Sequence, residues 1–429
     1  MEKNRSGFPY IKSKKMKILL LLGTFNFPPR NGGDQALINA IDKLNGYVDF
    51  HLVSVADSSD LNINLEEFRR SYPNIPSTTY IIDQNCRYRK VYSFCSRIAN
   101  AVNRRIGYSD VVKLQETMIY EPRFALLNEF YTFVNQYIAK NKIDIVQSEF
   151  WFTLGWMGGI TADVKRVFVQ HEIQYIVNSQ RMHQRNFDES DIRVQKIMRR
   201  SEINAMNSCD AIITLSSNDR DRLILDGVHT PIFSSFAQIK FDKFVYHDSM
   251  ANCNKLVFIG PESHLPNRHG LNWFFENVWP LVLSKKNDLY VDIIGRWSDN
   301  TIDDWSKRYC NVNFLGFVDD LKPAISNSVL IVPIFQGSGI RMKILEACNT
   351  GVPVVSSSIG AEGLGLIDGQ SAFITDDAVR FSNAILTLLD SPDTVSQFID
   401  SANKHIESSF SDEKFVESRM QCYNYLIQQ

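Results

Sequence analysis

A glycine-rich turn followed by two cations is the part of this chain with the clearest chemical potential. Gly337 and Gly339 precede a predicted helix that carries Arg341 and Lys343 in its first turn. The amino end of a helix holds roughly half a positive charge, so each cation there costs about 0.3–1 kcal/mol unless an anion offsets it. Glycines let backbone approach a ligand closely, and free amides at a helix start bind phosphate. The pattern predicts a bound phosphate, with solvated surface cations as the alternative.

Glu346 lies one turn beyond Lys343 in the same predicted helix, so the two side chains are neighbours on one face. The carboxylate can accept hydrogen bonds from hydroxyl groups of a ligand that the cation holds. A simple ion pair with Lys343 explains the same spacing. The sequence leaves both interpretations open.

His171 directly follows an apolar run that predicts a buried strand over 166–170. An imidazole at a strand end can hydrogen-bond a substrate hydroxyl or stabilise a developing charge. A lone histidine is more often structural, so this interpretation stands beside the functional one.

Gly32 and Gly33 lie between the first predicted strand and a helix expected over 36–43. Paired glycines there let backbone amides approach a phosphate or a reacting sugar, although a tight turn explains them nearly as well. The dinucleotide pattern G-x-G-x-x-G is missing at this point, which disfavours hydride transfer.

Asp219 and Asp221 have a spacing that could suggest a metal site. Serines and early acids are also what the start of a helix prefers. We therefore interpret this segment as helix capping and expect no metal ion.

Residues 86–105 interleave basic and aromatic side chains and contain no acid. This composition suits an anionic membrane surface or a lipid-linked phosphate. A solvated basic helix is the alternative.

The overall composition excludes several classes of protein. A chain of 429 residues predicts two domains of about 200 residues each, and 44% hydrophobic residues with a net charge of −2 indicate a soluble globular protein without a nucleic-acid partner. Seven cysteines without a C-x-x-C pair indicate a reducing cytosol. The apolar run 18–22 is too short to span a membrane, so we expect a cytoplasmic protein that is at most peripheral on the inner face of the membrane.

Short apolar runs alternate with helical patterns, which indicates parallel βαβ units. The first series of expected strands covers 17–23, 51–55, 143–147, 166–170 and 211–215. The second series covers 255–260, 290–294, 312–315, 330–333 and 352–356. This restart predicts two doubly wound halves joined by a linker at 230–254. Amphipathic helices are expected at 382–389 and 412–427, the last capped by Ser411 or Asp412.

Together these residues resemble the retaining glycosyltransferases of family four, of group 1 type, over roughly residues 17–425. The more specific motifs lie in the second half, at 258–260, 266–270, 273–280, 314–321, 337–347 and 360–364. The resemblance implies the GT-B architecture, an α/β fold of two facing Rossmann-like domains with parallel sheets. It places the domains at 16–235 and 236–400, with a helical segment at 401–429 that returns to the first domain.

The resemblance also implies a nucleotide-diphosphate sugar donor that is bound mainly by the second domain. Glu346 would hold the ribose, and the loop of Gly337, Ser338 and Gly339 would face the diphosphate with Arg341 and Lys343. His171 would contact the donor sugar, with Gly32 and Gly33 beneath it. The base pocket would contain Gly316, Phe317 and Val318. Asn267, Arg268 and Glu362 complete the expected donor-binding set.

The implied activity is hexosyl transfer, with retention at the anomeric carbon, to a hydroxyl of a glycan or lipid-linked saccharide in surface polysaccharide or glycoconjugate assembly. A leaving phosphate oxygen can take the acceptor proton, so neither a metal ion nor another cofactor is expected.

Two positions depart from the family pattern. Ser338 stands where a second glutamate often touches the donor sugar, and Pro261 stands where an arginine is common. Arg341, Lys343 or Arg268 can supply the missing cation. Two alternative functions follow, a sugar-nucleotide epimerase of similar shape and a non-catalytic nucleotide-sugar-binding partner subunit, which Ser338 keeps open.

Overall fold

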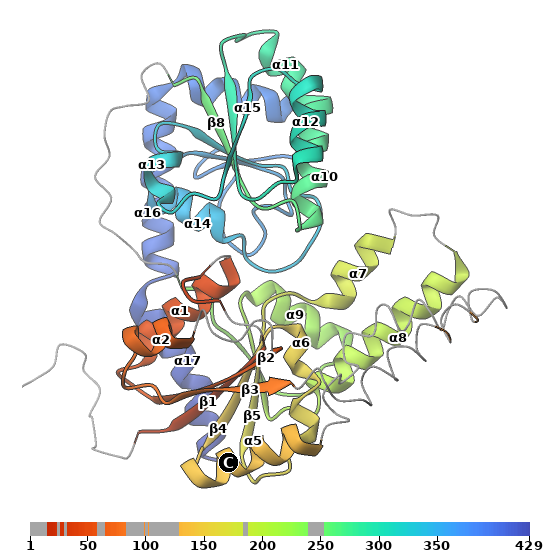
Figure 1. Ribbon diagram of the computed structural model, residues 1–429. Helices are drawn as coiled ribbons and strands as arrows, with labels where there is room; N and C mark the ends of the chain where they lie inside the picture. The colour runs from red at the N-terminus through yellow and green to blue at the C-terminus, as the bar shows by residue number, and fades with distance from the viewer. Residues whose placement is uncertain are drawn as a thin grey trace, which may run out of the picture.

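The computed structural model describes residues 15–23, 26–29, 32–57, 65–82, 128–182, 188–238 and 253–429, together with Ile98 and Val102. Two parallel sheets, each covered by helices on both faces, form two domains that stack end to end (Figure 1). The basic segment 86–105 lies outside the described residues, apart from Ile98 and Val102. The predicted α/β fold with two parallel sheets is confirmed.

The strand β1 (Lys17–Leu22) shows how the first sheet is held. Ile18 and Leu20 point into one hydrophobic core, whereas Leu19 and Leu21 point into a second core on the opposite face. A parallel strand that is buried on both faces reads as a continuous apolar run, which is why the sequence predicts it well.

The first sheet has the order β3-β2-β1-β4-β5-β6-β7. Its further strands are β2 (Asp49–Asp57), β3 (Ser77–Ile82), β4 (Ile145–Glu149), β5 (Lys165–Gln170), β6 (Ala211–Thr214) and β7 (Ile232–Ser234). Its helices are α1 (Gly32–Leu44), α2 (Leu65–Ser71), α5 (Asn128–Asn141), α6 (Trp151–Leu154), η1 (Met157–Gly159), α7 (Gln174–Met182), α8 (Glu189–Met206) and α9 (Ser217–Asp226).

The second sheet has the order β10-β9-β8-β11-β12-β13. Its strands are β8 (Lys255–Ile259), β9 (Tyr290–Ile294), β10 (Val312–Gly316), β11 (Val329–Val332), β12 (Val354–Ser356) and β13 (Phe373–Ile374). The helices that follow them are α10 (Leu265–Trp273), η2 (Phe274–Val278), α11 (Trp279–Leu283), α12 (Asp299–Arg308), α13 (Leu321–Ile325), α14 (Met342–Asn349) and α15 (Ala378–Asp390).

Three strands were not predicted from the sequence, and a physical reason explains why each was missed. β3 is a half-exposed edge strand without an apolar run, β7 has three half-buried residues inside the expected linker, and β13 has only two residues. Edge strands have only one strand neighbour and bury less apolar surface, so their hydrophobic signal is weak.

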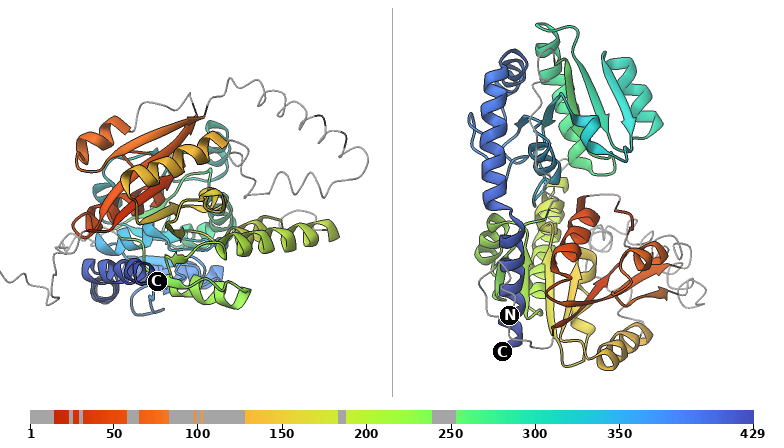
Figure 2. Two further views of the ribbon diagram at one scale, coloured as in Figure 1. Left: turned by 90° about the horizontal axis from the view of Figure 1, so that it is seen from below. Right: turned by 90° about the vertical axis from the view of Figure 1, so that its left-hand side faces the viewer.

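Two helices connect the domains along one side of the molecule. α16 (Pro392–Ser409) places Val395 and Phe398 in the core of the second domain, whereas α17 (Asp412–Ile427) places Phe415 and Tyr423 in a core of the first. The two helices form a column that spans both domains (Figure 2). The boundary expected at residue 401 therefore falls within α16, and the chain crosses between the domains next to Ser411, which caps α17 as predicted.

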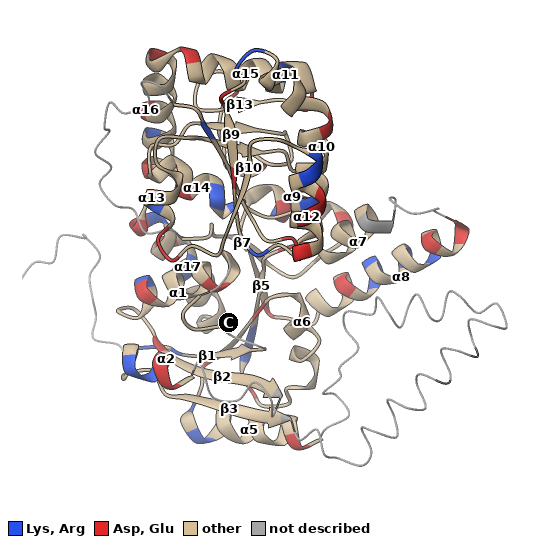
Figure 3. Cartoon of the chain, turned by 45° about the horizontal axis from the view of Figure 1, so that its top comes forward, with Lys and Arg blue, Asp and Glu red and all other residues tan. Residues whose placement is uncertain are grey.

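α8 projects from the first domain (Figure 1). Charges of both signs alternate along it (Figure 3), including an ion pair between Arg193 and Glu189. Side chains of this kind form a solvated face.

Candidate functional site

The glycine loop between β11 and α14 packs directly against the first domain. Gly337 and Gly339 have φ values of +110° and +83°, which an L side chain rarely adopts. A Cβ atom at Gly339 would lie 2.4 Å from the backbone oxygen of His171. Glycine is therefore required at residue 339 both for its conformation and for the close approach of the two domains.

Hydrogen bonds of the two residues before Gly339 tie the same loop to the first domain. The backbone N–H of Gly337 donates to Oε1 of Gln180 at 2.5 Å. Ser338 is buried, and its Oγ accepts from the backbone N–H of Ile173 at 2.8 Å. Three consecutive loop residues thus contact the segment that begins at His171, so the loop and the histidine hold each other in place.

The sequence predicted Arg341 in the first turn of the helix. The structure places it one position before the helix, because α14 begins at Met342. Its guanidinium group is buried and turns back onto the loop, where Nη1 donates to the backbone oxygens of Ser338 at 2.7 Å and Gly339 at 2.6 Å. These bonds satisfy carbonyl groups of a strained turn, so Arg341 shapes the loop.

Lys343 and Glu346 lie on α14 and form the most strongly perturbed pair of the site. The Nζ atom of Lys343 lies 4.6 Å from the centre of the Phe258 ring and donates to Oδ1 of Asn267 at 3.1 Å. Burial, reinforced by the charge of Arg341, lowers the pKa of Lys343 to about 7. Burial also raises the pKa of Glu346 to about 7, although the charge of Lys343 opposes this shift. Both groups therefore titrate near neutrality, which is typical of binding and catalytic sites.

Asn267 holds Lys343 through a second contact at the exit of β8. Its Nδ2 atom donates to the backbone oxygen of Pro261 at 2.8 Å, so Oδ1 faces the ammonium group. Arg268 behaves differently, since it is 47% exposed and pairs with Glu262 at 3.6 Å. Asn267 thus joins the predicted cluster, and Arg268 forms an ion pair beside it.

His171 is held on two sides by residues that the sequence analysis did not identify. Its Nε2 atom lies 2.7 Å from Oε2 of Glu149, and its ring stacks on Phe150 with 4.2 Å between ring centres. Phe150 has a φ of +67°, a rare conformation for a bulky residue. The signal in the sequence is an acid at the end of a buried strand, but the predicted strand ended at Gln147, two residues too early.

Gly32 brings the first domain close to the start of α14. A Cβ atom at Gly32 would lie 3.4 Å from Cγ of Met342. The sequence predicted that Gly32 and Gly33 precede the helix. In the structure α1 begins at Gly32, so both glycines belong to its first turn. The amino ends of α1 and α14 therefore face the same region, and two such helix ends favour an anion.

The residues expected to line the base pocket lie at the exit of β10. Gly316 ends this strand with a φ of +67°, and its backbone oxygen accepts from Gly295 at 2.7 Å. Phe317 is 53% exposed, while Val318 packs partly against the core. An exposed aromatic ring at a strand exit offers a stacking surface for a planar ligand.

Glu362 lies at a second contact between the domains. A Cβ atom at Gly363 would lie 3.1 Å from Cβ of Ser216. Ser216 caps α9 by accepting from the backbone N–H of Asp219 at 3.0 Å, which confirms the predicted capping. Burial, helped by the charge of Glu362, raises the pKa of Asp219 to about 6 against the opposing effect of the hydrogen bond from Ser216.

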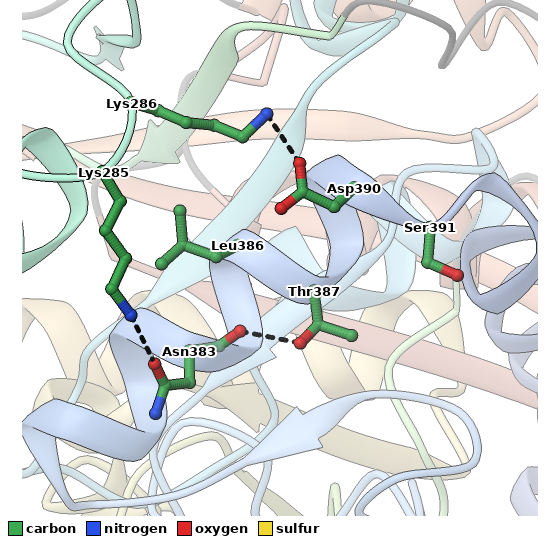
Figure 4. Close-up of a pocket in the computed structure, with 7 residues that line it drawn as sticks. All are labelled: Lys285, Lys286, Asn383, Leu386, Thr387, Asp390 and Ser391. Atoms are coloured by element: carbon green, nitrogen blue, oxygen red, sulfur yellow. Dashed lines mark hydrogen bonds and ion pairs between the residues drawn. The ribbon is translucent and has the colours of Figure 1, made fainter.

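A cavity of about 530 Å³ lies away from all these residues, between the end of α11 and α15 (Figure 4). Lys286 pairs with Asp390 at 2.7 Å, and Lys285 donates to Asn383 at 3.3 Å. Both lysines that line the cavity already have partners, so the cavity is a weaker candidate for an anion site than the start of α14.

In the part of the chain that the structure describes, no helix is both long and apolar enough to cross a membrane. Among the same residues, no group of three or more His, Cys, Asp or Glu side chains could hold a metal ion.

Family models match both halves of the chain. Residues 90–233 match the model described as Glycosyltransferase Family 4, and residues 253–391 match Glycosyl transferases group 1. A protein from Klebsiella pneumoniae, described as an uncharacterized 44.6 kDa protein in cps region, is 28% identical over 224 residues. That match covers 49% of this chain and 55% of the relative, so this chain spans about half the length of that protein.

Solved structures share the fold over almost the whole chain at low sequence identity. A mutant of TarM from S. aureus, in complex with fondaparinux, alpha-GlcNAc-glycerol and UDP, is 13% identical with a TM-score of 0.66 and covers 95% of this chain and 100% of its own. HepE from Anabaena in complex with UDP is 14% identical with a TM-score of 0.66, and the match covers 96% of this chain and 100% of HepE. Sucrose-phosphate synthase from Thermosynechococcus elongatus is 14% identical with a TM-score of 0.64, again covering 96% and 100%.

Proposed function

The chain belongs to the family-four glycosyltransferases with the GT-B fold, and from this premise we propose that it transfers a hexosyl group from a nucleotide-diphosphate sugar to an acceptor hydroxyl. The anomeric configuration is retained in this proposal. The acceptor is a glycan or a lipid-linked saccharide, and the reaction serves surface polysaccharide or glycoconjugate assembly.

The observation that carries this proposal is the pair of Lys343 and Glu346 on α14, both with a pKa of about 7. A buried ammonium group that is held by Asn267 and the Phe258 ring offers a positive charge to a diphosphate. Glu346, one turn further, offers an acceptor for ribose hydroxyls. The two groups together match the two polar ends of a nucleoside diphosphate.

The remaining donor contacts follow from the neighbouring elements. Backbone amides at the starts of α1 and α14 stabilise the phosphates, and Phe317 stacks on the base. UDP in the similar structures of TarM and HepE supports a nucleoside diphosphate in this chain as well.

The chemistry of the reaction requires stabilisation of the leaving diphosphate. Breaking the glycosidic bond places negative charge on its oxygen, where Lys343 and the preorganised amides stabilise the transition state more than the ground state. That leaving oxygen takes the proton of the acceptor hydroxyl. His171 contacts the donor sugar and orients it. Neither a metal ion nor another cofactor takes part.

The proposal also gives a location for the acceptor. The donor lies mainly on the second domain, so the acceptor enters over the first. The basic segment 86–105 would hold the protein at the anionic inner face of the membrane, close to a lipid-linked acceptor.

The test is a survey of nucleotide-diphosphate sugars with a pool of glycan and lipid-linked acceptors. We expect one donor to release its nucleoside diphosphate in proportion to a new glycoside of the same anomeric configuration. Rapid formation of a free nucleotide sugar with inverted stereochemistry, without any acceptor, would support an epimerase. Binding of a donor without any turnover would support a non-catalytic subunit.

A further inference from the structure

A chain of hydrogen bonds leads from the terminal helix α17 to His171. The hydroxyl of Tyr423 donates to Oε1 of Gln147 at 2.6 Å, and Nε2 of Gln147 donates to Oε1 of Glu149 at 2.6 Å. The other oxygen of Glu149, Oε2, lies 2.7 Å from Nε2 of His171. The chain thus links α17, β4 and the loop after β5.

The chemistry of the carboxylate fixes the direction of every bond. An ionised carboxylate can only accept, so the Gln147 atom that faces it must be nitrogen and its amide oxygen must face Tyr423. For the same reason, Nε2 of His171 carries a hydrogen. Burial raises the pKa of the Tyr423 hydroxyl, which therefore stays protonated and can donate. Glu149 is the one member of the chain that accepts from both sides.

Burial makes this arrangement rigid. Tyr423 is fully buried, Glu149 and Gln147 are almost so, and Glu149 uses both of its oxygens. Buried polar groups that lack a partner are costly, so each bond is maintained by the need to satisfy the next. Phe150 stacks on one face of the His171 ring and restricts its rotation.

We propose that Glu149 is a positioning residue that holds His171 as the tautomer protonated at Nε2, and that Tyr423 supports it through Gln147. The Nδ1 atom then presents a lone pair that accepts a hydrogen bond from the donor sugar. This role rests on the proposed function, in which His171 contacts that sugar. It also makes α17 part of the site, because this helix, formed where the chain has returned to the first domain, supplies the first bond of the chain.

Glu149→Gln tests the proposal with nearly unchanged shape. An amide has only one accepting oxygen, so it cannot accept from both Gln147 and His171 in their present orientations. We expect nitrogen NMR of the labelled histidines, with the His171 signal assigned by a His171→Asn variant, to show loss of the single Nε2-protonated tautomer. Turnover should fall tenfold or more, while affinity for UDP stays within twofold.

Tyr423→Phe and Tyr425→Phe form a matched pair on the same helix. Tyr423→Phe removes the first donor of the chain, so a second tautomer should appear and turnover should fall two- to fivefold. The described residues provide no hydrogen bond to the Tyr425 hydroxyl, whose ring packs beside Phe233. Tyr425→Phe should therefore leave both the tautomer and turnover unchanged.

A single Nε2-protonated tautomer and full turnover in folded Glu149→Gln would overturn the proposal, as would equal effects of the two tyrosine variants. A shifted tautomer in Glu149→Gln, in a protein that transfers no sugar from any donor, would instead sustain the positioning of His171 and refute the proposed function. The NMR signal and the turnover therefore separate the two claims.

Discussion

Lys343 and Glu346 are the residues through which sequence, structure and function connect most directly. Their spacing alone predicts neighbouring charges on one helix face. The structure adds that both residues are only partly exposed, and desolvation of their charged groups brings the pKa of each to about 7. Because the two groups respond to a bound nucleotide in opposite directions, variants that leave one of them in place separate their contributions.

Glu346→Gln should make the binding of a nucleoside diphosphate weaken as pH rises through neutrality. A diphosphate stabilises the ammonium form of Lys343, so binding takes up a proton where the free residue is neutral, and affinity falls by up to about tenfold per pH unit. The change also removes a carboxylate that raises the pKa of Lys343, so the fall starts at or below pH 7. Calorimetric titration with UDP from about pH 6 to about pH 9 measures it.

Lys343→Met should show the opposite pH dependence in the same titration. Ribose hydroxyls donate to the ionised form of Glu346, whose pKa rises further when the ammonium is removed, so binding should strengthen as pH rises above 7. Identical pH profiles for the two variants would mean that this pair does not contact the nucleotide.

The spacing of residues in the sequence could not predict where the Arg341 side chain points or which residue Glu149 contacts. Arg341 looked like a phosphate ligand because sequence shows the charge but not the carbonyl groups that receive it. Glu149 depends on a partner 22 residues away, which only the packing of β4 against β5 brings to it. His171 itself was identifiable because it directly follows a strand.

At the scale of elements, the glycine loop determines how the domains meet. Gly339 touches His171, and its neighbour Ser338 bonds Ile173. The same position that departs from the family pattern therefore has a partner across the domain boundary. The core strands were predictable because they are buried on both faces, whereas these contacts between domains leave no periodic signal.

Gly339→Ala should damage the site more than its backbone strain explains. The left-handed conformation costs about 1–2 kcal/mol for an L residue, and the new Cβ would also meet the backbone oxygen of His171. Gly369→Ala is the matched control, because Gly369 has a φ of +71° with no atom within 4 Å of its added Cβ. Thermal unfolding should show a loss of stability in both variants that is larger in Gly339→Ala, whereas turnover should fall strongly only in Gly339→Ala.

Ser338→Ala should weaken domain closure, because it leaves the buried N–H of Ile173 without its acceptor at a cost of about 1–3 kcal/mol. The cost falls on the contact between the domains, so small-angle scattering should show a more extended particle. Ser338→Thr keeps the hydroxyl and should restore the compact form. If the alanine and threonine variants scatter alike, the bond does not control closure.

At the scale of the molecule, two Rossmann-like domains, joined by α16 and α17, enclose the proposed donor site. The restart of the strand series made the two halves predictable. The point at which the chain crosses between the domains was harder to predict. Both α16 and α17 are amphipathic, and only their packing shows that α16 belongs to the second domain and α17 to the first. A second contact between the domains, where Gly363 meets Ser216, lies beside Asp219 and adds a pH dependence.

Asp219→Asn should make the free energy of unfolding depend less on pH on the acid side of neutrality. A carboxyl group whose folded pKa is raised gives stability that is complete below its unfolded value of 3.8 and is lost as pH rises through about 6. The variant should therefore exceed the wild type at pH 7 by up to about 3 kcal/mol. Equal stability of the two proteins at every pH from about 4 to about 7, by thermal unfolding, would contradict the burial of this charge.

The central claim is that the start of α14 binds the diphosphate and ribose of a nucleotide-sugar donor. Calorimetric titration of the whole chain with nucleoside diphosphates, beginning with UDP, tests it most directly. We predict that one of them binds with one-to-one stoichiometry and that Lys343→Ala and Glu346→Ala each weaken it about tenfold or more, since a charged hydrogen bond contributes about 1.5–3 kcal/mol. Unchanged affinity in both variants would contradict the account.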